Sequence, residues 1–293
     1  MNQALNGLPG RTVVTGAGGF LGRRLVATLR HRQQDVLAVG RSTGFDLLRD
    51  ELPLAPGDHV IHLAAATGVP DSWKDPAGFH LVNGHGTVRV LDACRRAGAT
   101  LTYVGAYIYG APKTLPISES HPLDVNNPYA FSKWMGEQAC GWYASTFNVG
   151  VTAIRLFNVY GAGQSDRFVV PRIVHQVLDP TVASVQLMDL TPRRDYLHAD
   201  DAVEALLASR PSLGQSFRVF NVGSGVSSSL GDVLDAAFDA AGIRKPVESS
   251  GEVRPNEIPD VRADCTAIRT STGWTARIPL RDGIAQMIRE LRP

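Results

Sequence analysis

The chain has 293 residues, 44% of them hydrophobic, so it can bury a substantial core in one large domain or two closely joined ones. A formal net charge of +1 gives no reason to expect nucleic acid or an anionic membrane as a partner, and small molecules are the expected ones. The widely separated Cys94, Cys140 and Cys265 match no metal spacing, so we expect reduced thiols, no metal and a cytoplasmic location. We expect neither a secretory signal nor a run of roughly 18 apolar residues that would span a membrane.

Strand-like and helix-like segments alternate through the first half of the chain. This alternation predicts an α/β fold, a doubly wound parallel sheet with helices on both faces. In chain order the predicted elements are a strand at 11–15, a helix at 19–32, strands at 35–39 and 59–65, a helix at 83–97, a strand at 101–104, a helix at 128–143 and a strand at 151–157.

The second half changes character from residue 171, where short elements are broken by proline and glycine. This change predicts a dinucleotide-binding domain at 1–170 and a smaller substrate-binding lobe at 171–293. Within the lobe, segment 195–225 is expected to return to the first domain, because it contains a helix-like and a strand-like stretch that fit the main sheet.

A glycine-rich turn connects the first predicted strand to the first predicted helix. Gly16 permits the tight bend, Gly19 lets a pyrophosphate approach the backbone, and Gly22 allows the helix to pack against the sheet. The helix N-terminus at Phe20 and Leu21 then faces the phosphates. The pattern predicts dinucleotide binding; the alternative is an ordinary tight strand-to-helix connection.

The end of the second predicted strand indicates which dinucleotide is bound. A carboxylate there would bind the adenosine ribose of NAD, but the position is Gly40, followed by Arg41 and Ser42, which suit the extra phosphate of NADP. NADP is therefore favoured, with NAD possible. Asp46 and Leu47, slightly later, are further candidate cofactor contacts, while the alternative for Arg41 is a solvated surface arginine.

Tyr129 and Lys133 are candidate catalytic residues. Their i, i+4 spacing puts the phenol and the ammonium on one helix face, where the cation can favour phenolate over phenol. Alone the pair is a common pattern, but behind a dinucleotide-binding turn it predicts proton transfer beside a nicotinamide.

Further motifs follow in order along nearly the whole chain. They lie at residues 15–22, 60–65, 83 with 86–87, 109–110, 129 with 133, 155–161, 194–198, 221–223 and 254–255. With these motifs the chain resembles the extended short-chain dehydrogenase/reductase family, specifically its nucleotide-sugar epimerases, dehydratases and ketoreductases. The resemblance implies a Rossmann-type fold and a nucleotide-sugar substrate.

The resemblance also implies roles for residues near the cofactor. Tyr129 would be the proton donor or acceptor, and Lys133 would hold the nicotinamide ribose and lower the pKa of the tyrosine. Asn83 would steady the helix that follows it. The strand end passing along the cofactor would comprise Leu63, Ala64 and Ala65.

The resemblance places substrate contacts mainly in the second half of the chain. Asn158 and Arg254 would hold the diphosphate of the nucleotide-sugar, to which an amide donor and a guanidinium are suited. The alternatives are a loop-capping amide and a surface ion pair. Arg194 is a weaker candidate, because it can simply pair with a nearby carboxylate.

One position departs from the family pattern. A serine or threonine normally lies five residues before the glycine of the Tyr-Gly pair and hydrogen-bonds the reacting sugar oxygen, but here that position is Gly105. Losing such a donor costs on the order of a hundredfold in rate when nothing replaces it. Tyr107, Thr67 or a bound water are candidate replacements; otherwise the chemistry has changed or has been reduced to binding.

The same segment argues against dehydration. Sugar 4,6-dehydratases of this family carry an acidic pair directly after the hydroxyl residue, whereas this chain has Ala106 and Tyr107. Elimination of water then lacks its acid and base. Reduction of a 4-keto-sugar and 4-epimerisation remain. The NADP-like strand end favours an NADPH-dependent ketoreductase, while an epimerase with tightly held NAD and a non-catalytic cofactor-binding protein stay open.

Family members often pair through the helix that carries the tyrosine and the helix before it. Trp134, Met135, Cys140 and Trp142 can supply apolar contacts for such a homodimer, or can simply fill the core. We expect a homodimer.

Overall fold

A computed structural model describes residues 10–252 and 257–292. The chain divides into two compact units. The first contains the described residues up to Ile108 together with Asp124–Arg155 and Leu206–Phe220; the second contains the remaining described residues. The assignment of 1–170 and 171–293 as functional domains stays a prediction. Within the described part of the chain, no helix combines the length and apolar character needed to cross a bilayer.

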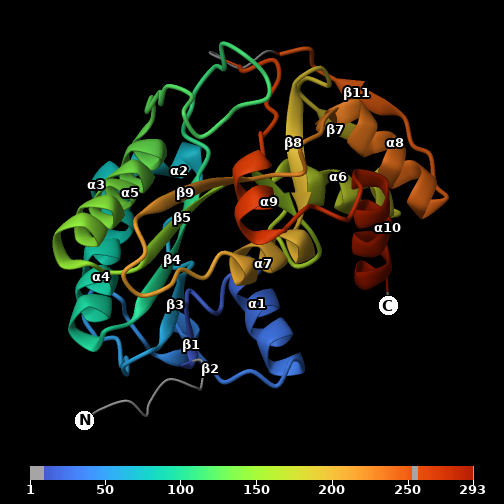
Figure 1. Ribbon diagram of the computed structural model, residues 1–293. Helices are drawn as coiled ribbons and strands as arrows, with labels where there is room; N and C mark the ends of the chain where they lie inside the picture. The colour runs from blue at the N-terminus through green and yellow to red at the C-terminus, as the bar shows by residue number, and fades with distance from the viewer. Residues whose placement is uncertain (1–9, 253–256, 293) are drawn as a thin grey trace, which may run out of the picture. The chain divides into compact units, whose positions relative to one another are not determined.

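A six-stranded sheet forms the centre of the α/β fold (Figure 1). Its order is β2-β1-β3-β4-β5-β9, and β1 pairs in parallel with β2 and β3, as β3 does with β4. The strands are β1 (Thr12–Thr15), β2 (Val36–Val39), β3 (His59–His62), β4 (Thr100–Ala106), β5 (Val151–Leu156) and β9 (Arg218–Val222). The predicted parallel sheet is thereby confirmed.

The first-unit helices cover both faces of this sheet. In Figure 1, α4 (Gly86–Ala97) and α5 (Pro128–Phe147) lie together on one side of the strands and α1 (Phe20–His31) on the other. Central strand residues such as Val13 and Val60 are fully buried. A strand that is covered on both faces consists mostly of apolar residues, and this pattern in the sequence made the strands predictable.

Short helical segments occupy the connections of the first unit. They are η1, a 3₁₀ turn at Arg41–Thr43, then α2 (Val69–Lys74), α3 (Pro76–Phe79) and η2 (His80–His85). The last is a π-helix that continues directly into α4, so the helix predicted from residue 83 begins earlier and with a wider turn. π-helical turns often occur at functional sites.

The second unit contains two small sheets and the remaining helices. One sheet has the order β10-β8-β6 and the other pairs β11 with β7. The strands are β6 (Asn158–Tyr160), β7 (Val185–Leu187), β8 (Arg193–His198), β10 (Ser227–Ser229) and β11 (Val247–Ser249), and the helices are α6 (Val169–Leu178), α7 (Ala199–Ala208), α8 (Leu230–Ala241), α9 (Thr266–Thr272) and α10 (Leu280–Leu291). Ile173, Val233 and Ile284 are fully buried in its core.

Candidate active site

The strand order creates a switch point between β1 and β3, because the chain continues to β2 on one side and to β3 on the other. In open parallel sheets, ligands bind beside the carboxyl ends of strands at such a point.

The glycine turn follows β1 at this switch point. Gly16 has φ +69°, and a Cβ on it would lie 2.6 Å from the backbone nitrogen of Ala64. A Cβ on Gly22 would lie 2.2 Å from the carbonyl oxygen of Gly16. Both positions therefore require glycine.

The start of α1 fits the pyrophosphate of a dinucleotide. Gly19 is the N-cap and offers no side chain to the helix, and the first turn, which begins with Phe20 and Leu21, carries no acidic residue. The unpaired N–H groups of a helix N-terminus and its dipole favour a phosphate. The cradle predicted from the glycines thus has the backbone geometry that a dinucleotide needs.

The segment after β2 presents the expected cation and hydroxyl. Arg41 and Ser42 are exposed in the 3₁₀ turn that follows Gly40. A Cβ on Gly18 would lie 2.3 Å from the Ser42 hydroxyl oxygen, so this hydroxyl lies against the glycine turn. Asp46 accepts a hydrogen bond from the Leu48 amide at 2.9 Å, an interaction within its own loop.

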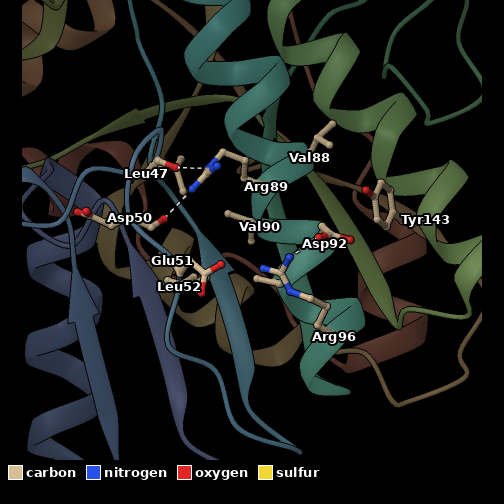
Figure 2. Close-up of a pocket in the computed structure, with 11 residues that line it drawn as sticks. Leu47, Asp50, Glu51, Leu52, Val88, Arg89, Val90, Asp92, Arg96 and Tyr143 are labelled. Atoms are coloured by element: carbon tan, nitrogen blue, oxygen red, sulfur yellow. Dashed lines mark hydrogen bonds and ion pairs between the residues drawn. The ribbon is translucent and has the colours of Figure 1, made fainter.

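Leu47 lies beside a separate hollow of about 240 Å³ on the first unit (Figure 2). The Arg89 guanidinium of α4 donates to the carbonyl oxygens of Leu47 and Asp50, each at 2.8 Å. Acidic and basic side chains alternate around the hollow, and Arg96 pairs with Asp92 at 2.7 Å. Arg89 therefore anchors to α4 the loop in which the predicted contacts Asp46 and Leu47 lie.

Helix α5 begins where the sequence supplies a cap. The Asn127 side chain accepts a hydrogen bond from the Ala130 amide at 2.9 Å, and Pro128 occupies the first turn. Tyr129 therefore lies in the first turn, where its ring packs edge-on against Phe79 with centroids 6.3 Å apart. Lys133, one turn later, is buried.

Lys133 makes two contacts with β4. Its ammonium donates to the carbonyl oxygen of Val104 at 2.6 Å and lies 4.7 Å from the ring centre of Tyr103. Burial lowers the pKa of Lys133 to about 8. These contacts hold the amine between α5 and the end of β4.

The pKa of Tyr129 shifts in the direction opposite to the sequence expectation. Although the residue keeps part of its surface exposed, desolvation, with a smaller electrostatic effect of Tyr107, raises the pKa of Tyr129 to about 12. The expectation of a lowered pKa counted the nearby cation but not the cost of burying the phenolate, and Lys133 is not among the causes of the shift. With this pKa the phenol is protonated at neutral pH.

Gly105 is buried where the family pattern expects a hydroxyl. A Cβ there would lie 3.1 Å from the Ile154 carbonyl oxygen and 3.9 Å from a carboxylate oxygen of Glu137. Tyr107 follows two residues later and is half-buried, whereas Thr67 is exposed. Tyr107 also influences the pKa of Tyr129, so it is the better placed of the two candidate replacements.

The predicted substrate residues of the second half belong to the second unit. Asn158 is partly buried, and its amide donates weakly, at 3.5 Å, to the Asp195 carbonyl oxygen. Arg194 donates to the Ile258 carbonyl oxygen at 2.6 Å and pairs with the carboxylate of Glu257. This ion pair is the alternative to substrate binding that was expected for Arg194. Arg254 lies outside the described residues.

The segment after β3 is joined to Asn83, whose role beside the cofactor stays a prediction. Leu63, Ala64 and Ala65 follow the strand directly, and the Asn83 side chain both accepts from the Ala66 amide, at 2.7 Å, and donates to the Ala66 carbonyl oxygen, at 3.0 Å. The structure thus ties this strand end to η2.

Two features were missed in the sequence. Arg155 of β5 forms a buried two-point ion pair with Glu137, at 2.6 and 3.0 Å, one turn beyond Lys133 on α5. Ser132 bonds both Asn83 and the backbone of Tyr129. The spacing of Tyr129, Lys133 and Glu137, four residues each, was the available signal that all three share one helix face.

Comparison with known proteins identifies related chains. A family profile described as the NAD dependent epimerase/dehydratase family matches residues 12–223. GDP-6-deoxy-D-mannose reductase of Pseudomonas aeruginosa is 31% identical, over 95% of this chain and 96% of its own. UDP-glucose 4-epimerase of Mycolicibacterium smegmatis is 30% identical, over 96% and 98%. The structure of RMD from Pseudomonas aeruginosa complexed with NADPH superposes with a TM-score of 0.85 at 29% identity, covering 96% of this chain and 98% of that one.

Proposed function

Because the chain belongs to the NAD-dependent epimerase/dehydratase family, we propose that it reduces the keto group of a nucleoside-diphosphate 4-keto-sugar with NADPH. The observation that carries this proposal is the end of β2, where Gly40 stands in place of an acidic residue and Arg41 and Ser42 are exposed. A cation and a hydroxyl suit a 2′-phosphate, and a carboxylate would repel it. The likeness to a GDP-sugar reductase and to a structure with NADPH supports the same reaction.

In the proposed reaction, Tyr129 gives its proton to the oxygen of the substrate carbonyl. NADPH, when bound, supplies the hydride. The raised pKa of Tyr129 keeps the phenol protonated at neutral pH, which suits a donor. The proposed role of Lys133 is to bind the nicotinamide ribose and to stabilise the phenolate left after proton transfer; its burial on the same helix, at the Val104 carbonyl oxygen, supports this role.

Tyr107 is our candidate for the hydroxyl that Gly105 lacks. Along β4, Tyr103 reaches α5, since its hydroxyl donates to the Lys133 carbonyl oxygen at 2.8 Å, and Gly105 faces Glu137 of the same helix. Tyr107 lies directly after the end of β4, two residues beyond Gly105, and is half-buried. We propose that its phenol takes the place of the missing hydroxyl at the substrate oxygen. Asn158 of the second unit is the first proposed contact to the diphosphate, with Arg254, which lies outside the described residues, and, more weakly, Arg194, which already pairs with Glu257, as the others.

The decisive experiment is an assay of purified protein with NADPH and a panel of GDP-, dTDP- and UDP-4-keto-sugars, followed by the loss of reduced-cofactor absorbance. Turnover of at least one of them is expected. The absence of turnover, together with interconversion of C4 epimers by protein that retains NAD through purification, would favour the epimerase. Cofactor binding without either reaction would favour a non-catalytic protein.

Substitution of Arg41 by alanine tests the cofactor assignment. An exposed arginine on a 2′-phosphate makes a charge-assisted contact of about 1.5–3 kcal/mol, so R41A should raise the KM for NADPH roughly tenfold or more. The KM for NADH should change less than about twofold. Arg49→Ala is the matched control, because Arg49 is exposed in the following loop and pairs with Asp46 at 3.6 Å. Equal effects of R41A on the two cofactors would contradict NADP specificity.

We propose a homodimer that pairs through α4 and α5. Along α5, three aromatic side chains are exposed, Trp142 (53%), Phe147 (42%) and Phe131 (40%), and exposed aromatic surface of this kind supports an interaction site. Cys140 is fully buried in the core, so it takes no part. Light scattering should give twice the 31.5 kDa of one chain, and W142E should give the single-chain mass. A wild-type protein of single-chain mass at micromolar concentration would refute the dimer.

A further inference from the structure

A buried chain of hydrogen bonds starts at the glycine turn. The Ala64 amide donates to the Thr15 hydroxyl at 3.3 Å, and this hydroxyl lies 2.7 Å from Nδ1 of His62. Nε2 of the same imidazole lies 3.2 Å from the Thr87 hydroxyl, which donates to the Asn83 carbonyl oxygen at 2.6 Å. None of the three side chains is more than 2% exposed.

These partners determine the direction of every bond. A hydroxyl has one proton, and Thr87 gives its proton to a carbonyl oxygen, so Nε2 of His62 must carry a hydrogen. Burial lowers the pKa of His62 to about 3, so the ring is neutral and Nδ1 accepts from Thr15. The imidazole is therefore held as a single tautomer that connects the end of β1 to the first turn of α4.

Asn83 carries the connection into the catalytic helix. Its side chain clamps the backbone of Ala66, and its second amide hydrogen goes to the Ser132 hydroxyl oxygen at 2.8 Å. Ser132 in turn donates to the Tyr129 carbonyl oxygen at 2.7 Å. Ser132 is fully buried, so both of its bonds are shielded from water.

The packing around this link leaves no room for sliding. A Cβ on Gly136 would lie 3.1 Å from the Asn83 carbonyl oxygen and 2.6 Å from the Tyr103 hydroxyl. Helix α5 therefore sits directly on η2, and a shift of one element has to break the Ser132 or the Asn83 bonds. This close approach makes the hydrogen bonds a determinant of where Tyr129 lies.

We propose that His62, Asn83 and Ser132 are positioning residues that hold the phenol of Tyr129 in register with the cofactor cradle formed by the glycine turn and residues 63–66. This inference rests on the proposed function, because it assigns a role in placing the proton donor. In the proposed reaction none of the three residues touches a reacting atom. Ser132 acts through the backbone of Tyr129, and His62 acts through Thr15 and Thr87.

Ser132→Ala tests the last link, with Ser145→Ala as its matched control. Ser145 also lies on α5 and donates to the carbonyl oxygen three residues earlier, that of Trp142 at 3.1 Å, but it is exposed and lies near the opposite end of the helix from Tyr129. A displacement of about 1 Å at a reacting group costs up to about a hundredfold, so S132A should lower kcat at least tenfold with NADPH affinity within twofold of the wild type. S145A should change neither. Equal kcat values for the two variants would overturn the proposal.

Thr87→Val tests the network from its other end and covers the case in which S132A fails to fold. Valine keeps the shape of threonine but removes the acceptor for His62 and the donor for Asn83. We expect faster hydrogen exchange at the Ala66 amide and in the first turn of α5, and a lower kcat. Unchanged exchange at both places would overturn the network. Because exchange needs no turnover, this measurement remains decisive if the wild type reduces no keto-sugar and the proposed reaction itself fails.

Discussion

Tyr129→Phe is expected to lower kcat by roughly 10²–10⁴-fold, the usual contribution of a positioned general acid. The substitution removes only the hydroxyl, and the ring keeps its edge-on contact with Phe79. Affinity for NADPH, measured by quenching of protein fluorescence, should stay within about twofold. The separation of a large effect on kcat from a small effect on binding identifies the hydroxyl as a group that acts in the transition state.

Tyr143→Phe is the control for this substitution. Tyr143 lies on the same helix with a largely buried ring, and it lines the hollow of Figure 2. Its kcat should match that of the wild type. If Y129F retained activity within threefold while Tyr107→Phe lost it, the proton donor would have been assigned to the wrong tyrosine, and Tyr107 would take its place.

The first-unit fold could be predicted because local signals and burial agree there. Short β-branched stretches such as Val13-Val14 and Val60-Ile61 identify strands whose residues are fully buried, and the Asn127-Pro128 cap marks the start of α5. The π-helix at His80–His85 could not be predicted, since its wider turn depends on tertiary contacts of Asn83 with Ala66 and Ser132. No local pattern in the sequence encodes those partners.

Sequence motifs indicated the residues of the candidate site but not their pKa values or long-range partners. The spacing of Tyr129 and Lys133 placed them on one helix face, yet their pKa values depend on how much water the fold removes, and both shift toward the neutral form. Arg194 matched a family motif, but its pairing with Glu257 depends on a chain segment 63 residues away. A motif specifies which residue types are present, whereas burial and long-range partners decide their charge.

The largest effect on stability is expected for Glu137. Its carboxylate and the Arg155 guanidinium are both buried, so Glu137→Ala leaves a cation without its partner in a dry interior. Breaking such a pair on one side costs about 3–5 kcal/mol of unfolding free energy. Circular dichroism, recorded during unfolding in urea, should show this loss as a lower urea concentration at the midpoint. The slope of the unfolding free energy against urea concentration should stay unchanged.

Two comparisons separate the cost of an unpaired charge from other losses. In the double variant Glu137→Leu, Arg155→Met, both charges are gone and similar volume is kept, so stability should return close to that of the wild type, because a buried ion pair roughly balances its own desolvation. Asp92→Ala removes the partly exposed partner of Arg95 and Arg96 on α4 and should cost less than about 1 kcal/mol. A Glu137→Ala variant no less stable than Asp92→Ala would mean that water reaches Arg155. In the wild type, the Glu137 carboxylate near Gly105 would then be solvated. The interior next to Lys133 would not be the dry region that raises the pKa of Tyr129.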